Sequence, residues 1–108
     1  MDLRELPLFP LNTVLFPGGP LRLRIFEARY LDMVRDCMKT DSDFGVVAIR
    51  HGGEVGPADV HPVGTTAEIV DWTQEPDGLL GLAVAGRRRF RIEALAQQPD
   101  GLYLGRVD

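Results

Sequence analysis

The first forty residues constrain the fold most, because they pass from strand patterns to a helix pattern within a short distance. Residues 6–11 form an apolar run that contains two prolines, which indicates a short strand at the edge or at the start of a sheet. The Pro17-Gly18-Gly19-Pro20 stretch predicts a turn after it. Residues 21–25 then alternate leucine or isoleucine with arginine, which predicts a half-buried strand whose arginines face water.

A helix is expected next, over residues 27–39, because the spacing of the apolar residues changes to that of a helix. Glu27 in the first turn and Lys39 in the last turn suit the helix dipole. The apolar residues that share one helical face are Tyr30, Leu31, Val34, Cys37 and Met38. This face predicts that the helix packs on a core.

The rest of the chain shows strand patterns separated by turns. Residues 44–50 are almost entirely apolar, which favours a central strand, and residues 51–62 are typical of a loop rich in glycine and proline. Turns are expected at Pro76-Asp77-Gly78 and at residues 97–101, and Gly86 is expected to allow a bend or bulge. The strands between these points are expected at residues 63–73, 79–85, 87–95 and 102–107.

Together these elements predict a mainly β fold of the α+β class. It has one early α-helix and about six or seven strands, mostly antiparallel because tight Asp-Gly turns join them, in a small and partly closed barrel. A chain of 108 residues makes one domain and is long enough to bury a core. Residues 102–108 continue as a strand with no terminating pattern, so we expect the domain to cover residues 1–108 of a longer protein.

Composition restricts the partners and the setting of the protein. The net charge of −4 does not favour nucleic acid, because phosphate binding depends on neutralisation by lysine and arginine. Cys37 is the only cysteine, which excludes an internal disulfide and a cysteine zinc cluster. The N-terminus lacks the pattern of a signal peptide, and no apolar run approaches the ~20 residues that cross a bilayer. We therefore expect a soluble cytoplasmic protein without a membrane partner.

Six segments of the chain carry a family resemblance when they are taken in order. They include Leu-Phe-Pro-Leu-Asn-Thr-Val-Leu-Phe-Pro-Gly-Gly at 8–19, Phe-Gly-Val-Val at 44–47 and Gly-Arg-Arg-Arg-Phe-Arg-Ile at 86–92. The other three are residues 23–34, 63–71 and 77–82. In these segments the chain resembles the amino-terminal domain of Lon proteases, and most of all the stand-alone bacterial proteins that have this domain without a protease.

This resemblance implies a fold and a class of function. The fold would be a PUA-like pseudo-barrel with one helix, normally followed by a helical segment that this sequence does not include. The function would be recognition of unfolded or tagged polypeptides, with support for oligomer assembly; one eukaryotic relative carries such a domain in the substrate receptor of a ubiquitin ligase. Ala28 stands where the family often has a proline, at the start of the helix, and the effect should be small.

Catalytic parts of a protease are not found in the sequence. The stretch at residues 52–56 contains glycines but no following lysine, so it is not a phosphate-binding loop for ATP. The only serine, Ser42, and the only lysine, Lys39, lie among acidic residues and are better explained as solvated surface than as a catalytic pair. Cys37 shares the apolar helix face and is better explained as a packed core thiol. We expect no enzyme activity and no cofactor.

A metal site is a weaker alternative in the loop at residues 51–62. His51, Glu54, Asp59 and His61 all lie there, but their spacing fits no established ligand signature. An ordinary surface loop explains them better.

Binding residues are sought among the aromatic residues and the arginines. Phe9, Phe26, Tyr30 and Phe44 are expected in the core. Phe16, in a proline and glycine connection, and Trp72, near a hairpin tip, are the candidates for contact with an unfolded or extended polypeptide. Capture would use an exposed apolar patch or a free sheet edge, and self-association is a further possibility.

The alternative functions are RNA binding and a small-ligand or assembly role. Residues 87–91 contain four arginines beside Phe90, and arginines next to an aromatic residue can serve RNA. Strand alternation places Arg89 and Arg91 opposite Phe90, so a solvated strand face also explains them. No convergent polar cluster identifies a small ligand.

Overall fold

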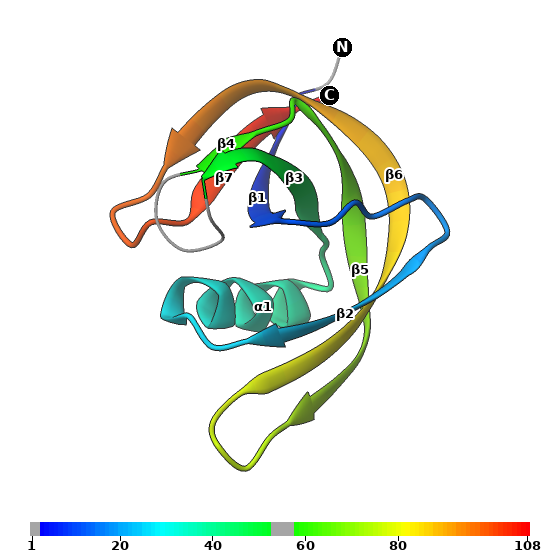
Figure 1. Cartoon of the computed structure of the whole chain (residues 1–108), viewed down its shortest axis with the longest axis vertical. Coiled ribbons are helices and arrows are strands. Elements are labelled where there is room, and N and C mark those ends of the chain that lie inside the picture. The colour runs from blue at the N-terminus through cyan, green and yellow to red at the C-terminus, as the bar shows by residue number, and fades with distance from the viewer. Residues whose placement is uncertain (1–2, 53–57) are drawn as a thin grey trace.

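A computed structural model describes residues 3–52 and 58–108 of the chain. It contains seven strands and one early helix, as the sequence predicts (Figure 1). In chain order these are β1 Arg4–Leu11, β2 Pro20–Ile25, α1 Ala28–Thr40, β3 Phe44–Gly52, β4 Ala58–Val60, β5 Val63–Gln74, β6 Leu80–Gln97 and β7 Tyr103–Val107. The half-buried strand at β2 and the central strand at β3 are confirmed.

The strands form a ring that is not fully a barrel. The sheet order is β1-β7-β6-β5-β3-β4, and a further pairing of β1 with β3 closes the ring. All pairings are antiparallel except this parallel one. Strand β2 lies off this path, because it pairs only with β6 in the described part of the chain. The helix lies between the ring and β2 (Figure 1).

The first strand is paired on one side in each of its halves, as its prolines predict, but its partner changes along its length. Residues 4–8 of β1 pair with β7, and residues 8–11 pair with β3. Each half of β1 therefore has its partner on one side only, among the described residues. A proline, which has no N–H to donate, fits a strand that is paired in this way. The sequence pattern shows the proline but not the distant partner strand.

Residues 80–97 form one long strand, where the sequence predicts two strands separated at Gly86. Strand β6 stays continuous because register shifts in its pairing with β5 absorb the bend. One of these shifts lies between the Thr65–Arg89 and Ala67–Gly86 pairs, so the bulge expected beside Gly86 is confirmed. Gly86 has a second role. A Cβ built there would lie 2.2 Å from the Phe16 carbonyl oxygen, so only glycine allows the β1–β2 connection to approach β6 this closely.

The turn before β2 is confirmed in detail. The Gly19 N–H donates to the Phe16 carbonyl at 2.8 Å, and Gly18 has a φ of +80°. Pro17 therefore stands at the second position of a type II turn and Gly18 at the third, which requires positive φ. This turn presents Phe16 to solvent.

The predicted loop at residues 51–62 is only partly a loop. His51 and Gly52 belong to the end of β3, and residues 58–60 form β4, which pairs with β3. Residues 53–57 lie outside the described part of the chain. Because residues 51–62 are rich in glycine and proline, their sequence shows no strand pattern, and the pairing of β4 with β3 was not predicted.

The helix packs on the core by a face that differs slightly from the predicted one. Its buried residues are Tyr30, Met33, Val34 and Cys37, whereas Met38 is 42% exposed. Glu27 is the N-cap residue rather than part of the first turn. At the other end Asp41 adopts a left-handed conformation and its N–H donates to the Cys37 carbonyl, which ends the helix.

Two clusters of buried side chains form the interior. The larger one lies under α1, where the rings of Phe9 and Tyr30 stack with their centroids 4.0 Å apart, and Phe44 packs beside Phe9. The smaller one gathers Leu6, Leu8, Val47, Phe90, Tyr103 and Val107. Phe9, Tyr30 and Phe44 are thus core residues as predicted. Phe26 is 63% exposed, so its assignment to the core is wrong.

The described residues contain no helix that is long and apolar enough to cross a membrane.

Candidate functional site

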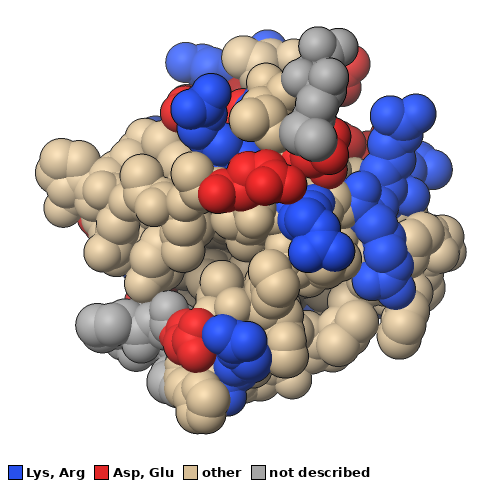
Figure 2. Space-filling model, turned by 90° about the horizontal axis from the view of Figure 1, so that it is seen from above, with Lys and Arg blue, Asp and Glu red and all other residues tan. Residues whose placement is uncertain are grey.

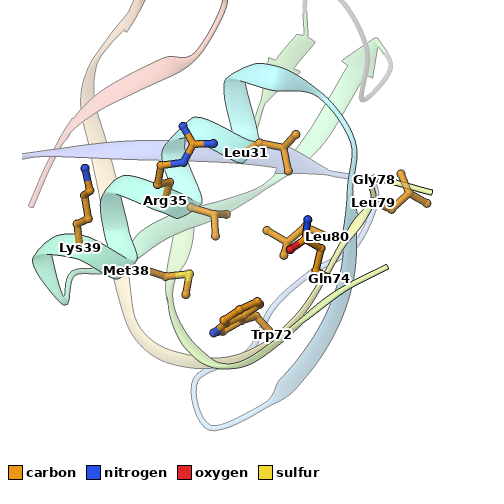
Figure 3. A pocket seen from close by; sticks show the side chains of 10 residues that line it. Leu31, Arg35, Met38, Lys39, Trp72, Gln74, Gly78, Leu79 and Leu80 are labelled. Carbon is orange, nitrogen blue, oxygen red and sulfur yellow. The ribbon is translucent and has the colours of Figure 1, made fainter. Parts of the chain in front are cut away.

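A groove lies between α1 and the hairpin that joins β5 to β6, and we call it the α1–hairpin groove. Its volume is about 500 Å³. From the helix it is lined by Leu31, Val34, Arg35, Met38 and Lys39, and from the hairpin by Trp72, Gln74, Gly78, Leu79 and Leu80. In Figure 3, Met38 points from α1 toward Trp72 across the gap. A pocket of this size accommodates a few side chains of a partner.

The local sequence explains how the groove arises. Leu31 and Met38 are two helical turns apart, so they lie on the same side of α1. Trp72 pairs with Leu82 in the β5–β6 ladder, near the end of β5. The hairpin that joins β5 to β6 extends past the ring in Figure 1. Because the hairpin projects here, the helix covers it only partly. Trp72 consequently remains 51% exposed.

Large apolar side chains that are half-exposed and adjacent mark interaction surfaces. The indole of Trp72 gives a large and rigid contact area. Met38 is flexible and polarisable, and it adapts to differently shaped partners. The α1–hairpin groove thus has the composition of a surface that binds apolar side chains.

The α1–hairpin groove and a neighbouring hollow carry charges of opposite sign. Arg35 and Lys39 lie at its rim, and their charged ends point away from the gap in Figure 3. Arg35 makes an exposed ion pair with Asp32, with Nη1 3.3 Å from Oδ1. On the other side of Trp72, a hollow is lined by Asp41, Asp43, Glu68 and Asp71 among others. Burial, followed by the charge of Glu68, raises the pKa of the Asp43 carboxyl.

Phe16 lies elsewhere, so the structure does not bring the two predicted contact residues together. Phe16 is 60% exposed and its backbone packs on Gly86, whereas Trp72 pairs with Leu82, four residues away on β6. Four residues of strand span roughly 13 Å. The buried hydroxyl of Thr65 donates to the Leu15 carbonyl at 2.7 Å and holds the connection that carries Phe16.

The arginines at residues 87–91 face solvent, while Phe90 is buried, as the alternation predicts. Arg87 pairs with Glu68, and this hydrogen bond raises the pKa of the Arg87 guanidinium. Arg89 lies over the Phe16 ring at 5.9 Å from its centroid. Figure 2 shows basic groups interrupted by acidic and uncharged ones on the face it presents, rather than one basic surface.

The remaining sequence candidates have ordinary surroundings. Asp59 accepts hydrogen bonds from Arg50 at 3.1 Å and from His51 at 3.2 Å, and these bonds lower the pKa of the Asp59 carboxyl. Glu54 lies outside the described residues. Within residues 3–52 and 58–108, no group of three or more histidine, cysteine, aspartate or glutamate residues could hold a metal ion. Cys37 is buried, and burial raises the pKa of its thiol.

The sequence pointed to Trp72 but missed the residues that surround it. The helical spacing predicts Met38 and Leu31 on the core face, and the turn pattern places Leu79 and Leu80 only at the start of a strand. The partial exposure of these four side chains depends on how far the β5–β6 hairpin projects beyond α1. The sequence does contain a sign of this exposure. The apolar face of the helix is wider than packing against one core requires, which indicates that part of it stays exposed.

Comparison with known proteins identifies the family. The profile of the ATP-dependent protease La (LON) substrate-binding domain matches residues 5–108. Lon protease 2 of Myxococcus xanthus is 37% identical in an alignment 106 positions long, which covers 95% of this chain and 13% of that protein. Cereblon of zebrafish (Danio rerio) is 30% identical in an alignment 110 positions long, which covers 98% of this chain and 25% of that protein. The chain thus spans a small part of these relatives.

Solved structures agree with this assignment. The crystal structure of the Lon N-terminal domain protein from Xanthomonas campestris matches with a TM-score of 0.87 and 44% identity, over 97% of this chain and 59% of that one. The N-terminal domain of the Mycobacterium avium complex Lon protease matches in fold, with a TM-score of 0.73 and 16% identity. The chain belongs to the family of Lon substrate-binding domains.

Proposed function

We propose that this protein binds unfolded or extended polypeptide segments, and that the α1–hairpin groove is a contact surface with Trp72 as its anchor. The observation that carries the proposal is a half-exposed tryptophan that faces Met38 across a groove of about 500 Å³. The family description as a substrate-binding domain supports a protein partner. The cytoplasmic setting predicted from the sequence belongs to the same proposal.

The groove suits side chains of an extended segment rather than a folded surface. Covering a large apolar side chain is worth about 1.5–3 kcal/mol, so two or three such contacts give weak and reversible binding once the cost of ordering the segment is subtracted. The positive ends of Arg35 and Lys39 favour segments in which acidic residues flank the apolar ones.

RNA binding by the arginines of β6 receives less support. Arg87 is engaged by Glu68, and Arg89 lies over Phe16. The net charge of −4 also opposes attraction of a polyanion. A salt-sensitive RNA affinity that disappears in Arg89→Ala and Arg91→Ala would favour this alternative.

The test is a titration of fluorescently labelled, reduced and carboxymethylated lactalbumin, followed by anisotropy. We expect Trp72→Ala and Met38→Ala each to weaken binding roughly tenfold, since a central apolar anchor is worth more than 1 kcal/mol. Leu95→Ala is the matched control, because Leu95 is also exposed but lies on β6 outside the groove. Equal affinity in all three variants would refute the groove as the binding surface.

A further inference from the structure

Strand β2 has a free edge that lines a second groove. All six residues of β2 pair with β6, and β2 has no other partner strand among the described residues. The groove beside its other edge has a volume of about 250 Å³. We call it the β2-edge groove, and its lining consists of Phe9, Leu11, Thr13, Tyr30 and all of residues 21–27.

Gly86 shows which backbone groups of β2 face this edge. The N–H and the carbonyl of Gly86 both bond to the turn that precedes β2, at 2.8 Å each, so Gly86 directs its backbone groups to the β2 side. Backbone groups alternate between the two sides along an antiparallel strand. Strand β2 pairs with β6 without a register shift, so the backbone groups of Leu21, Leu23 and Ile25 bond to β6. The N–H and carbonyl groups of Arg22 and Arg24 therefore face the free edge.

The side chains beside the edge alternate in character. Leu21 and Leu23 are half-buried and face inward with the ring of Tyr30, whereas Arg22 and Arg24 are exposed on the outer face. Arg24 pairs with Glu75, with Nη2 3.1 Å from Oε2. Arg22 has no ion pair within the described part of the chain. An added strand would meet apolar surface on one face, and on the other the unpaired charge of Arg22 beside the Arg24–Glu75 pair.

We infer that the free edge of β2 binds an extended peptide with alternating apolar and acidic residues, which joins the sheet as an additional strand. This inference rests on the proposed function and specifies a substrate class and a mode of binding for it. Backbone hydrogen bonds at Arg22 and Arg24 supply affinity, and the alternation of side chains supplies selectivity. The acidic residues lie opposite the two arginines, as favourable cross-strand pairs.

Charge also decides between a peptide and a second copy of this chain. If two β2 edges paired with each other, the arginines of one strand would lie opposite those of the other on the same face. Like charges in cross-strand positions are destabilising. An acidic peptide meets no such repulsion.

The experiment uses three short synthetic peptides and isothermal titration calorimetry. The probe alternates valine and glutamate, and the first control alternates valine and lysine. The second control is the probe with an N-methyl group on each glutamate, the residues that lie opposite Arg22 and Arg24. N-methylation removes hydrogen-bond donors and keeps the side chains. We expect the probe to bind, and both controls to bind at least about tenfold more weakly, because the hydrogen bonds to the Arg22 and Arg24 carbonyls, or the charge pair with Arg22, are lost.

Variants of the protein locate the site. Arg22→Pro removes the outward N–H without touching the β2–β6 hydrogen bonds, and it should weaken probe binding about tenfold more than Arg22→Ala, which keeps the N–H. Circular dichroism checks that both variants fold, and the N-methylated peptide on the unchanged protein tests the same hydrogen bonds independently.

Several outcomes would overturn the inference. These are no binding of the probe, equal binding of the N-methylated peptide, or a loss of probe binding in Trp72→Ala with none in Arg22→Pro. The last result would move the peptide to the α1–hairpin groove and would leave the proposed function standing. Failure of lactalbumin to bind while the probe binds as expected would count against the α1–hairpin groove as a contact surface and not against the β2 edge.

Discussion

At the scale of single residues, Gly86 decides where the β1–β2 connection lies. We expect Gly86→Ala to destabilise the protein by about 1–3 kcal/mol, because the new methyl group would overlap the Phe16 carbonyl and force the backbone apart. Urea denaturation measures the change. Gly81→Ala in the same strand is the control, since its Cβ would have ordinary contacts starting at 3.4 Å. Equal losses in the two variants would contradict the argument from close approach.

The buried thiol of Cys37 should make the stability of the protein depend on pH. Burial raises the pKa of the Cys37 thiol above its ordinary value of 9.0. Below pH 9 the thiol is neutral in both folded and unfolded chains. Above pH 9 the unfolded chain loses this proton first, so stability falls as pH rises toward the folded pKa. Cys37→Ala should lose less stability than the unchanged protein above pH 9. Parallel curves of unfolding free energy against pH would show that Cys37 does not contribute.

At the scale of elements, Arg29 joins the start of α1 to the turn between β6 and β7. Its side chain is only 11% exposed, its Nε lies 3.1 Å from Glu27 Oε2, and its Nη1 donates to the Gly101 carbonyl at 2.7 Å. Its guanidinium also lies 4.7 Å from the centre of the Tyr30 ring. These contacts tie together segments that are far apart in the sequence.

We expect Arg29→Ala to cost about 2–4 kcal/mol of unfolding free energy, because it leaves the Glu27 carboxylate without its partner and the Gly101 carbonyl with only its hydrogen bond from Gln97. Arg35→Ala removes an exposed ion pair of α1 and should change the free energy by less than about 0.5 kcal/mol. Chemical denaturation of both variants tests this. The prediction is wrong if the two losses are similar.

The elements also show what the sequence could and could not predict. The turn at Phe16-Pro17-Gly18-Gly19 and the alternation of β2 are local, so composition and spacing predicted them. The change of partner along β1 and the continuity of β6 depend on strands far along the chain, and local patterns do not report such partners. Met38 is exposed for the same reason, because the reach of the hairpin decides what covers it.

At the scale of the whole molecule, the parts of the chain that extend beyond the closed ring produce the two surfaces proposed for a polypeptide. The β5–β6 hairpin extends past the helix and opens the α1–hairpin groove. Strand β2 lies off the closed path and keeps a free edge. The exposure of Trp72 was predictable, because it stands near a hairpin tip. The groove around it and the free edge of β2 were not predictable, since both depend on how distant elements are placed.

The central claim is that an unfolded polypeptide covers Trp72, and the fluorescence of this residue tests it most directly. Trp72 is the only tryptophan in the chain, so with a tryptophan-free unfolded peptide all indole emission comes from the groove. As the half-exposed indole leaves water, we expect its emission to shift to shorter wavelength and to saturate with the same Kd as anisotropy of the labelled peptide. Saturable binding by anisotropy with an unchanged emission spectrum would contradict the account.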